Sequence, residues 1–335
     1  MKYIIILLLP ILFVCCTKES SNFIDETIHI RHQGATMPAY VHGNHSEKIF
    51  IVVLHGAGSY GLAFRDGVFR NQLEQKYVVV YFDQRAQSMA EGNFHSKEQL
   101  ISTMASDVDA LTKVLKKRYG SDLKLFLMGH SLGGLISAES LLSMDLQTQY
   151  LGWINVDGLL DVPSVNNARQ NLIAVIGDEQ QANSSMADEW VQLRNDALST
   201  EDYDGTLKLA SKTIELLYKD EVIPKPKKID KILQATFSNN PINWFISNFF
   251  NQPASIAIKE NYSLLPQLTA IEIPSLFIYG KYDVSVPPNT GRTAFLLISS
   301  QEKDFVVFDQ SIHHPHDTEP DKFGSVVSEF IEKHK

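Results

Sequence analysis

The chain has 335 residues, of which 44% are hydrophobic and 21% are charged, so it can form one large globular domain or one domain with an insertion. Its net charge of −9 and the lack of a long basic cluster argue against a nucleic-acid partner. Both cysteines lie at positions 15 and 16, which excludes a disulfide framework in the body of the chain.

The first 16 residues are predicted to be a signal segment rather than part of the fold. Lys2 supplies a positive charge, and the apolar run 3–14 after it is too short to span a bilayer as a helix. An ordinary cleaved secretory signal and an uncleaved hydrophobic anchor are alternatives. In each case we expect an exported protein.

Two cysteines directly after this run resemble the lipobox of bacterial lipoproteins, in which a cysteine after small residues is lipidated. Cys15 has Leu12 three residues before it but the bulky Val14 immediately before it. Cys16 follows a small residue, so we prefer Cys16 as the lipid anchor. The polar stretch 17–27 would then be a tether, and the resemblance implies a protein anchored to the membrane of a bacterial cell envelope.

Six strands are predicted in the body of the chain. The run 49–54 is continuously apolar and β-branched, as expected for a strand that is buried on both faces. Helical patterns separate the strands, for example a capping box at 96–99 followed by apolar residues at helical spacing. This alternation indicates an α/β fold with a mostly parallel sheet covered on both faces, whose ligands bind at the carboxyl ends of the strands. The six predicted strands are 49–54, 77–82, 123–128, 152–156, 275–279 and 305–308.

The strand rhythm disappears between residues 157 and 269, and we interpret this stretch as a helical cap inserted into a core formed by 28–156 and 270–335. Its aromatic side chains are expected to form the core of the cap, or alternatively to line an apolar substrate pocket. The predicted helices are 184–198, 203–218 and 229–237, and the aromatic pairs are Trp244 with Phe245 and Phe249 with Phe250.

The most informative motif is a serine between two glycines, Gly129-His130-Ser131-Leu132-Gly133, between a predicted strand and a predicted helix. Such a turn is a nucleophile elbow, which exposes the serine hydroxyl above the sheet. The glycines allow strand and helix to approach closely, and the start of the helix directs free N–H groups toward the same point. The motif can occur by chance, but its position between strand and helix favours a functional role.

Three further turns follow predicted strands. His55-Gly56-Ala57-Gly58 follows 49–54, a G-x-x-D-x-x-x-P turn around Asp283 follows 275–279, and an S-x-H-x-P turn around His313 follows 305–308. A serine hydroxyl is a poor nucleophile at neutral pH and needs a base, histidine can accept its proton, and a carboxylate orients the histidine.

Together these turns resemble the α/β-hydrolase family over about residues 28–330, in the order nucleophile, acid, histidine. The resemblance implies an α/β-hydrolase fold with an inserted helical cap. It makes Ser131 the nucleophile, Asp283 the acid and His313 the base, and it assigns the oxyanion hole to the amides of Leu132 and Ala57. It implies no metal and no organic cofactor.

His313 has two neighbouring rivals, His314 and His316. We prefer His313 because it alone lies two residues after Ser311 and two residues before Pro315.

Asp157 also ends a predicted strand and is the alternative acid, as in some relatives of the family. We prefer Asp283 because the Gly–Pro frame of its turn fits better. Of two further histidines, His130 is expected to be structural or to line the pocket, and His55 is expected to hydrogen-bond its own loop.

The segment 81–85, Tyr-Phe-Asp-Gln-Arg, resembles part of the D-Q-R-G-x-G-x-S motif of proline iminopeptidases. The match then breaks, with Ala86, Ser88 and Ala90 in place of the glycines and the serine. An aminopeptidase of that kind needs cap carboxylates to bind the free amine of its substrate. Nothing in the sequence selects among the candidates, and a solvated helix face is the simpler interpretation for each: Glu201, Glu215 and Glu221.

These observations predict a serine hydrolase that cleaves a carboxylic ester or amide of a small molecule through an acyl-enzyme. A proline-iminopeptidase-like exopeptidase is the alternative within enzymes. A non-catalytic, ligand-binding lipoprotein is the alternative of another class, against which the complete set of Ser131, Asp283 and His313 argues.

The lipobox-like segment predicts that the full-length protein incorporates labelled palmitate and fractionates with membranes, because several acyl chains anchor a protein stably. Cys16→Ser is expected to abolish labelling, and a chain that starts at Ser20 is expected to be soluble and active. Labelling that survives in Cys16→Ser but not in Cys15→Ser would move the anchor by one residue, and an unlabelled wild-type protein would remove the lipoprotein prediction.

Overall fold

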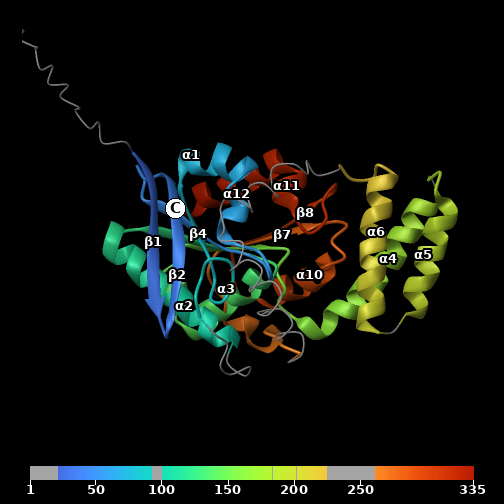
Figure 1. The fold of residues 1–335 in the computed structure, drawn as a ribbon, viewed down its shortest axis with the longest axis horizontal. Coiled ribbons are helices and arrows are strands. Elements are labelled where there is room, and N and C mark those ends of the chain that lie inside the picture. Colours follow the sequence, from blue (N-terminus) through green and yellow to red (C-terminus); the bar gives the residue numbers. More distant parts are fainter. Residues whose placement is uncertain (1–21, 93–99, 183, 201, 225–260) are drawn as a thin grey trace, which may run out of the picture.

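The computed structural model describes residues 22–92, 100–182, 184–200, 202–224 and 261–335. These residues contain one eight-stranded sheet in the order β1-β2-β4-β3-β5-β6-β7-β8 (Figure 1). The first two strands pair antiparallel with each other, and β2 pairs antiparallel with β4, whereas every later pairing is parallel. The strands are β1 (Phe23–His32), β2 (Ala35–Asn44), β3 (Ile49–Leu54), β4 (Val78–Phe82), β5 (Lys124–His130), β6 (Gly152–Val156), β7 (Ser275–Gly280) and β8 (Lys303–Phe308).

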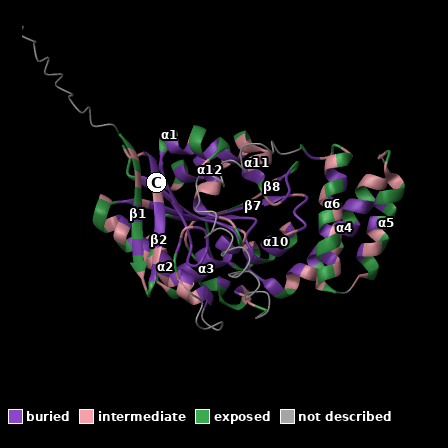
Figure 2. Cartoon of the chain, viewed as in Figure 1, coloured by how far each residue is buried: buried purple, intermediate pink, exposed green. Residues whose placement is uncertain are grey.

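Two layers of helices cover the sheet. On one face, α2 (Leu100–Tyr119), α3 (Leu132–Ser143) and α10 (Pro288–Leu297) pack on one set of alternating strand side chains. On the other face, the π-helical turn Phe69–Leu73 and α12 (Pro320–His334) pack on the alternate set. Figure 2 shows the buried residues concentrated between these layers. The central strands are therefore apolar throughout, because both of their faces are removed from water. The short helical segments are Gly61–Phe64, α1 (Glu74–Lys76), Leu146–Thr148, Leu265–Ala270 and α11 (Pro315–Thr318).

All six predicted strands are present, with ends that differ from the prediction by at most two residues. The prediction missed the N-terminal hairpin of β1 and β2. The tether prediction 17–27 is therefore wrong for residues 23–27, which lie in β1, and the core begins at Phe23 rather than at residue 28. Only Ile28 and Ile30 of β1 are buried, so its sequence lacks a long apolar run. Pairing with β2, rather than hydrophobicity, extends this strand.

The inserted cap stands at one side of the sheet and contains α4 (Val162–Gln181), α5 (Ala187–Ser199) and α6 (Tyr203–Lys219) (Figure 1). These helices pack on each other around residues such as Ile173, Trp190 and Leu217. Helices α5 and α6 match the predicted ranges, whereas α4 was not predicted. The predicted helix 229–237 and the aromatic pairs of 244–250 lie outside the described residues, as do residues 1–21 with the predicted lipid anchor.

The two ends of the cap insertion lie side by side. Asp161 and Ser263 form an isolated β-bridge, and the Val162 amide donates a hydrogen bond to the Tyr262 carbonyl at 2.9 Å. The predicted cap boundary at residue 269 is therefore a few residues too late: Leu264 and Leu268 are fully buried in the core beside the sheet. None of the helices in the described ranges combines the length and the apolar character needed to cross a bilayer.

Three residues of the iminopeptidase-like segment hold loops around the sheet. The Asp83 carboxylate accepts a hydrogen bond from the Gly61 amide at 2.7 Å, and the Gln84 side chain donates to the His55 carbonyl at 2.7 Å. Arg85 forms a buried bidentate ion pair with Asp107 of α2, at 2.6 and 2.8 Å. The segment therefore has a structural role that does not depend on substrate.

The buried Arg85–Asp107 pair predicts that Arg85→Ala lowers the free energy of unfolding by about 3–5 kcal/mol, because Asp107 would remain buried without its partner. Arg118→Ala is a matched control, since Arg118 pairs with Glu26 at the surface and its loss is expected to cost at most about 1 kcal/mol. Urea unfolding of the two variants measures the difference. Equal decreases in the free energy of unfolding would show that burial does not make the Arg85–Asp107 ion pair more important than the surface pair.

Candidate active site

Ser131 sits between β5 and α3 with a φ of 54° and a ψ of −119°. Two neighbouring glycines permit this backbone: a Cβ on Gly129 would lie 2.3 Å from the Gly133 carbonyl oxygen, and a Cβ on Gly133 would lie 2.2 Å from the Leu54 carbonyl oxygen. The Ser131 amide donates to the Val156 carbonyl of β6 at 3.1 Å. The turn is thus tied to the sheet, and the serine side chain is left to face the cavities beside it.

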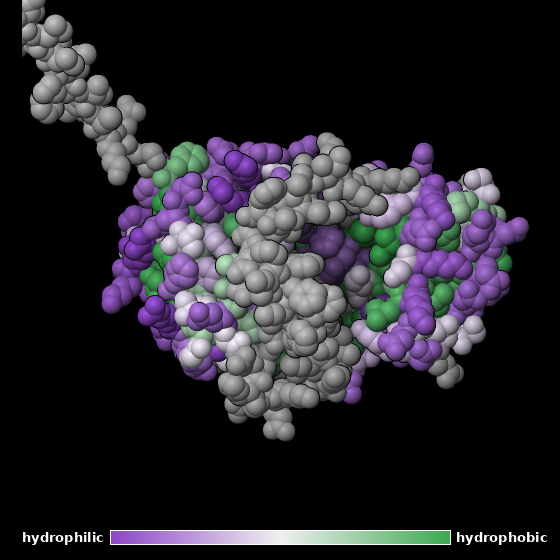
Figure 3. Space-filling view, in the orientation of Figure 1, coloured by the Kyte–Doolittle hydropathy of each residue, from purple (hydrophilic) through white to green (hydrophobic). Residues whose placement is uncertain are grey.

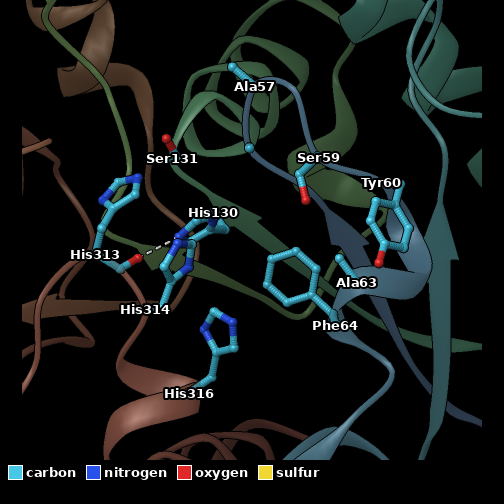
Figure 4. Close-up of a pocket in the computed structure, with 11 residues that line it drawn as sticks. Ala57, Ser59, Tyr60, Ala63, Phe64, His130, Ser131, His313, His314 and His316 are labelled. Atoms are coloured by element: carbon cyan, nitrogen blue, oxygen red, sulfur yellow. Dashed lines mark hydrogen bonds between the residues drawn. The ribbon is translucent and has the colours of Figure 1, made fainter. Parts of the chain in front are cut away.

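The predicted acid and the predicted base follow β7 and β8, the last two strands of the sheet. His313, after β8, has its Nδ1 2.7 Å from Oδ2 of Asp283, which follows β7. The other oxygen of Asp283 accepts hydrogen bonds from the amides of Ser285 and Val286 at 2.8 and 3.0 Å. Because Nδ1 is held by the carboxylate, Nε2 of His313 is the nitrogen left for a proton acceptor. Ser131 and His313 line the same two cavities and lie next to each other in Figure 4.

Asp157, the alternative acid, lies beside this pair. Its Oδ1 accepts a hydrogen bond from the Gly280 amide at 2.9 Å, and its Oδ2 has no hydrogen-bond partner among the described residues. Complete burial, and then the negative charge of Asp283, raise the pKa of Asp157 well above its usual value. The folded protein therefore favours the neutral form of Asp157, whereas Asp283 makes the hydrogen bond to the histidine.

The predicted oxyanion donors lie on either side of the serine. Leu132 is the first residue of α3, where an amide has no partner inside the helix. Neither the Leu132 amide nor the Ala57 amide donates a hydrogen bond within the described part of the chain. A Cβ on Gly56 would lie 3.0 Å from the Ser131 Cβ, so the turn that carries Ala57 passes directly against the nucleophile. This arrangement suits the stabilisation of an oxyanion by two amides.

His55 supports that turn. It is fully buried, its Nδ1 lies 2.7 Å from the Gly56 carbonyl oxygen, and its Nε2 accepts a hydrogen bond from the Gln84 amide. Burial lowers the pKa of His55 to about 4, so the ring is neutral at pH 7. His55 therefore holds its own loop, as the sequence predicts.

Comparisons with known proteins show similarity to hydrolases. The family model described as "Serine aminopeptidase, S33" matches residues 45–176. The chain is 23% identical over 279 residues to a probable aminopeptidase of Bacillus subtilis, covering 79% of this chain and 83% of the relative. It is 25% identical over 234 residues to a proline iminopeptidase of Saccharolobus solfataricus, covering 69% of each.

Solved structures extend the likeness to the whole fold. A proline iminopeptidase of Mycobacterium smegmatis superposes with a TM-score of 0.65 at 16% identity, covering 92% of this chain and 98% of that one. An esterase from Rhodococcus superposes with a TM-score of 0.59 at 19% identity, covering 94% and 100%. This chain has the α/β-hydrolase fold. The predicted fold class and enzyme class are confirmed, at the level of a serine hydrolase of the α/β-hydrolase type.

Two cavities of this α/β-hydrolase meet at Ser131 and His313. The first, which we call the histidine cavity, has a volume of about 420 Å³ (Figure 4). Its wall includes His130, whose ring nitrogen donates to the His313 carbonyl at 2.8 Å and whose pKa is lowered far below its usual value by burial and then by neighbouring histidines. The two rivals of His313 also line this cavity: His314 stacks on His130 and His316 stacks on Phe64.

Two groups of side chains hold three metal-ligand atoms each within 4.8 Å of one another. The first group overlaps the hydrogen-bond network of the acid and the base, and the second lies partly on the wall of the histidine cavity. They are His130 with Asp157 and His313, and His314 with His316 and Asp317.

The second cavity, which we call the cap cavity, has a volume of about 260 Å³ and lies between the cap helices α4 and α6 and the loop that follows Asp283. Its lining includes Arg169, a residue that sequence reasoning missed. The sequence pattern that could have revealed it is a single arginine among the apolar positions of α4, such as Val165, Ala168 and Ile173. Apolar and aromatic side chains line much of the rest of this cavity: Leu159, Val162, Val165, Tyr203, Leu207 and Ile214.

No carboxylate lines either cavity among the residues that the structure describes. Glu215, a candidate for amine recognition, pairs with Lys219 at 2.5 Å at the surface of α6. Glu221 lies beyond the end of α6, and Glu201 is outside the described residues. For Glu215 and Glu221 the structure thus agrees with the solvated-face interpretation.

The different environments of the two aspartates predict different effects of substitution. Asp283→Asn is expected to lower kcat by about 10³–10⁴ because it removes the charge that orients and stabilises His313. Asp157→Asn keeps the neutral form and is expected to change kcat by less than about tenfold. Steady-state kinetics at pH 7 measure both. If Asp157→Asn is the more damaging variant, the acid is wrongly assigned.

The proton on Asp157 also gives stability a pH dependence. The folded protein holds this proton while the unfolded chain loses it near pH 4, so the free energy of unfolding is expected to decrease as pH rises above about 4. Asp157→Asn is expected to flatten this decrease above about pH 4, as measured by urea unfolding. A curve that Asp157→Asn leaves unchanged would show that Asp157 is ionised in the folded protein.

Proposed function

We propose that this protein hydrolyses a carboxylic ester of a small molecule through an acyl-enzyme on Ser131. The observation that carries the proposal is the 2.7 Å hydrogen bond between His313 and Asp283 beside a serine held at a φ of 54°. A hydroxyl that is presented in this way next to an oriented imidazole is the arrangement that acyl transfer requires.

In the first half of the reaction, Ser131 Oγ attacks the carbonyl carbon and its proton passes to Nε2 of His313. The carbonyl oxygen becomes an oxyanion between the amides of Leu132 and Ala57, while Asp283 stabilises the imidazolium. The tetrahedral intermediate collapses, the bond to the leaving group breaks, and His313 returns the proton to the leaving oxygen.

In the second half, a water molecule attacks the acyl-enzyme and gives a proton to His313. Collapse of the second tetrahedral intermediate breaks the bond to Ser131 Oγ, which recovers the proton from the imidazolium. The products are the carboxylic acid and the free enzyme. His130 and His55 are expected to remain neutral throughout, since burial lowers the pKa of each.

An aminopeptidase of the proline iminopeptidase kind is the second candidate, because the family model and both relatives described above bear aminopeptidase names. The absence of a carboxylate from the described lining of both cavities favours the ester, since a free amine would lack a counter-charge there. The hydrogen-bonded acid and base argue against a non-catalytic binding protein.

We also propose that the protein is exported and anchored through Cys16. With β1 beginning at Phe23, residues 17–22 would separate the anchor from the core.

The proposal predicts that a fluorophosphonate probe labels Ser131 and that p-nitrophenyl butyrate is hydrolysed faster than Pro- or Ala-β-naphthylamide. Ser131→Ala is expected to lose labelling and to lower kcat by about 10⁴ or more with no loss of thermal stability. Ser143→Ala, at the far end of the same helix, is the matched control and is expected to keep both.

Labelling that persists in Ser131→Ala would contradict the assignment of the nucleophile. A preference for the naphthylamides, abolished by Ser131→Ala, would instead establish the exopeptidase.

A further inference from the structure

Arg169 is a buried cation on the wall of the cap cavity. Only 2% of the surface of Arg169 is exposed to solvent, and its side chain forms part of the cavity wall. Its Nε donates to the Val284 carbonyl at 2.8 Å and one terminal nitrogen donates to the Ser285 carbonyl at 3.2 Å. The other terminal nitrogen lies 3.4 Å from the Thr206 hydroxyl, which is a long contact.

Arg169 makes no direct ion pair within the described residues, although the negative charge of Asp283 lies near enough to favour its charged form. A guanidinium has five N–H groups, and the oxygens that it contacts directly here are uncharged: the carbonyls of Val284 and Ser285 and the hydroxyls of Thr206 and Tyr203. The ring centroid of Tyr203 lies 5.4 Å from the guanidinium carbon and adds a cation–π attraction to the hydrogen bond of its hydroxyl. Most buried charges in proteins are paired, because an unpaired one is costly to remove from water.

Apolar side chains surround this charge. Leu159, Val162 and Val165 lie on one side, and Leu207 and Ile214 of α6 lie on the other. Figure 3 shows apolar atoms gathered beside α6, on the side that faces the core. In such a setting, little water screens the charge, and a planar guanidinium binds a carboxylate through two parallel hydrogen bonds.

We propose that the cap cavity binds the acyl part of an ester whose chain ends in a carboxylate, and that Arg169 pairs with that carboxylate. The substrate class is then the half-ester of a short dicarboxylic acid. This inference rests on the proposed ester hydrolysis, because Ser131 and His313 line the same cavity and would receive the carbonyl carbon. A volume of about 260 Å³ suits a short chain, and the histidine cavity on the other side of Ser131 would take the alcohol.

The same charge disfavours the alternative substrate. A protonated amine in the cap cavity would meet a guanidinium rather than a carboxylate, and like charges in an apolar site repel strongly. Arg169 is thus a specificity-determining residue that selects for an anionic acyl chain and against a cationic one.

The experiment compares two substrate series with the full chain: monomethyl succinate, glutarate and adipate, and neutral methyl esters of matched chain length. The measured quantity is the ratio of kcat/KM for the anionic ester to kcat/KM for its neutral partner. We expect this ratio to exceed one for at least one chain length. Arg169→Met is expected to lower it by about 10- to 100-fold, the range for a hydrogen bond to a charged group.

Two further variants complete the design. Lys212→Met removes a partly exposed cation from α6 without touching the cap cavity and is expected to leave both kinetic constants and their ratio unchanged. Leu207→Glu adds a carboxylate to the partly exposed rim of the cavity and is expected to lower the ratio even if Arg169→Met does not fold.

The outcomes separate the two proposals. Neutral esters hydrolysed without any preference for half-esters would overturn the role of Arg169 and leave the proposed function intact. An equal fall of kcat for both series in Arg169→Met, with the ratio unchanged, would show that Arg169 acts only through the carbonyls after Asp283. If the wild-type protein hydrolyses neither series, both proposals fail.

Discussion

The left-handed backbone of Ser131 exists because Gly129 and Gly133 let β5 and α3 approach to distances at which a Cβ would collide with a carbonyl oxygen. A non-glycine residue in such a conformation costs about 1–3 kcal/mol and persists only when its surroundings enforce it. The surroundings here are a sheet whose central strands are buried on both faces. The stability of the sheet therefore holds Ser131 in place, and Asp283 and His313 lie nearby because β7 and β8 end at the same edge of the sheet.

The carboxyl groups of Asp157 and Asp283 both lie at that edge of the sheet. The number of hydrogen bonds that each accepts distinguishes the one that contacts His313. Asp283 receives two backbone amides and the imidazole, whereas Asp157 receives one amide and leaves its second oxygen without a partner in the described chain. Hydrogen-bond donors stabilise an ionised carboxylate, and a neighbouring negative charge destabilises it. The surroundings therefore favour the ionised form of Asp283 over that of Asp157. Asp283 holds the ring of His313 through a hydrogen bond, while the raised pKa of Asp157 favours its protonated form.

The cap is joined to this machinery through its first helix. Arg169 of α4 donates hydrogen bonds to the two carbonyls that directly follow Asp283, so one side chain contacts both the acid loop and the cap cavity. The same loop contributes Tyr282 and Val284 to the apolar cluster of the cap. The packing of the cap and the position of the acid are thus coupled, which is a physical reason for the cap helices to influence both the choice of substrate and the rate.

The sequence by itself determined the central sheet, because a strand buried on both faces must be a continuous apolar run, and it indicated Ser131, Asp283 and His313, because each lies in a turn of distinctive residues after such a run. It did not reveal the hairpin of β1 and β2, which is extended by pairing rather than by an apolar pattern, nor α4. Only the tertiary structure decided that Asp157 lies beside Asp283 with a raised pKa, and that Arg169 is buried without a direct ion pair in the described chain. The environment of each of these two side chains depends on which groups the fold brings next to it. Those groups can lie more than one hundred positions away in the sequence, as Val284 does from Arg169.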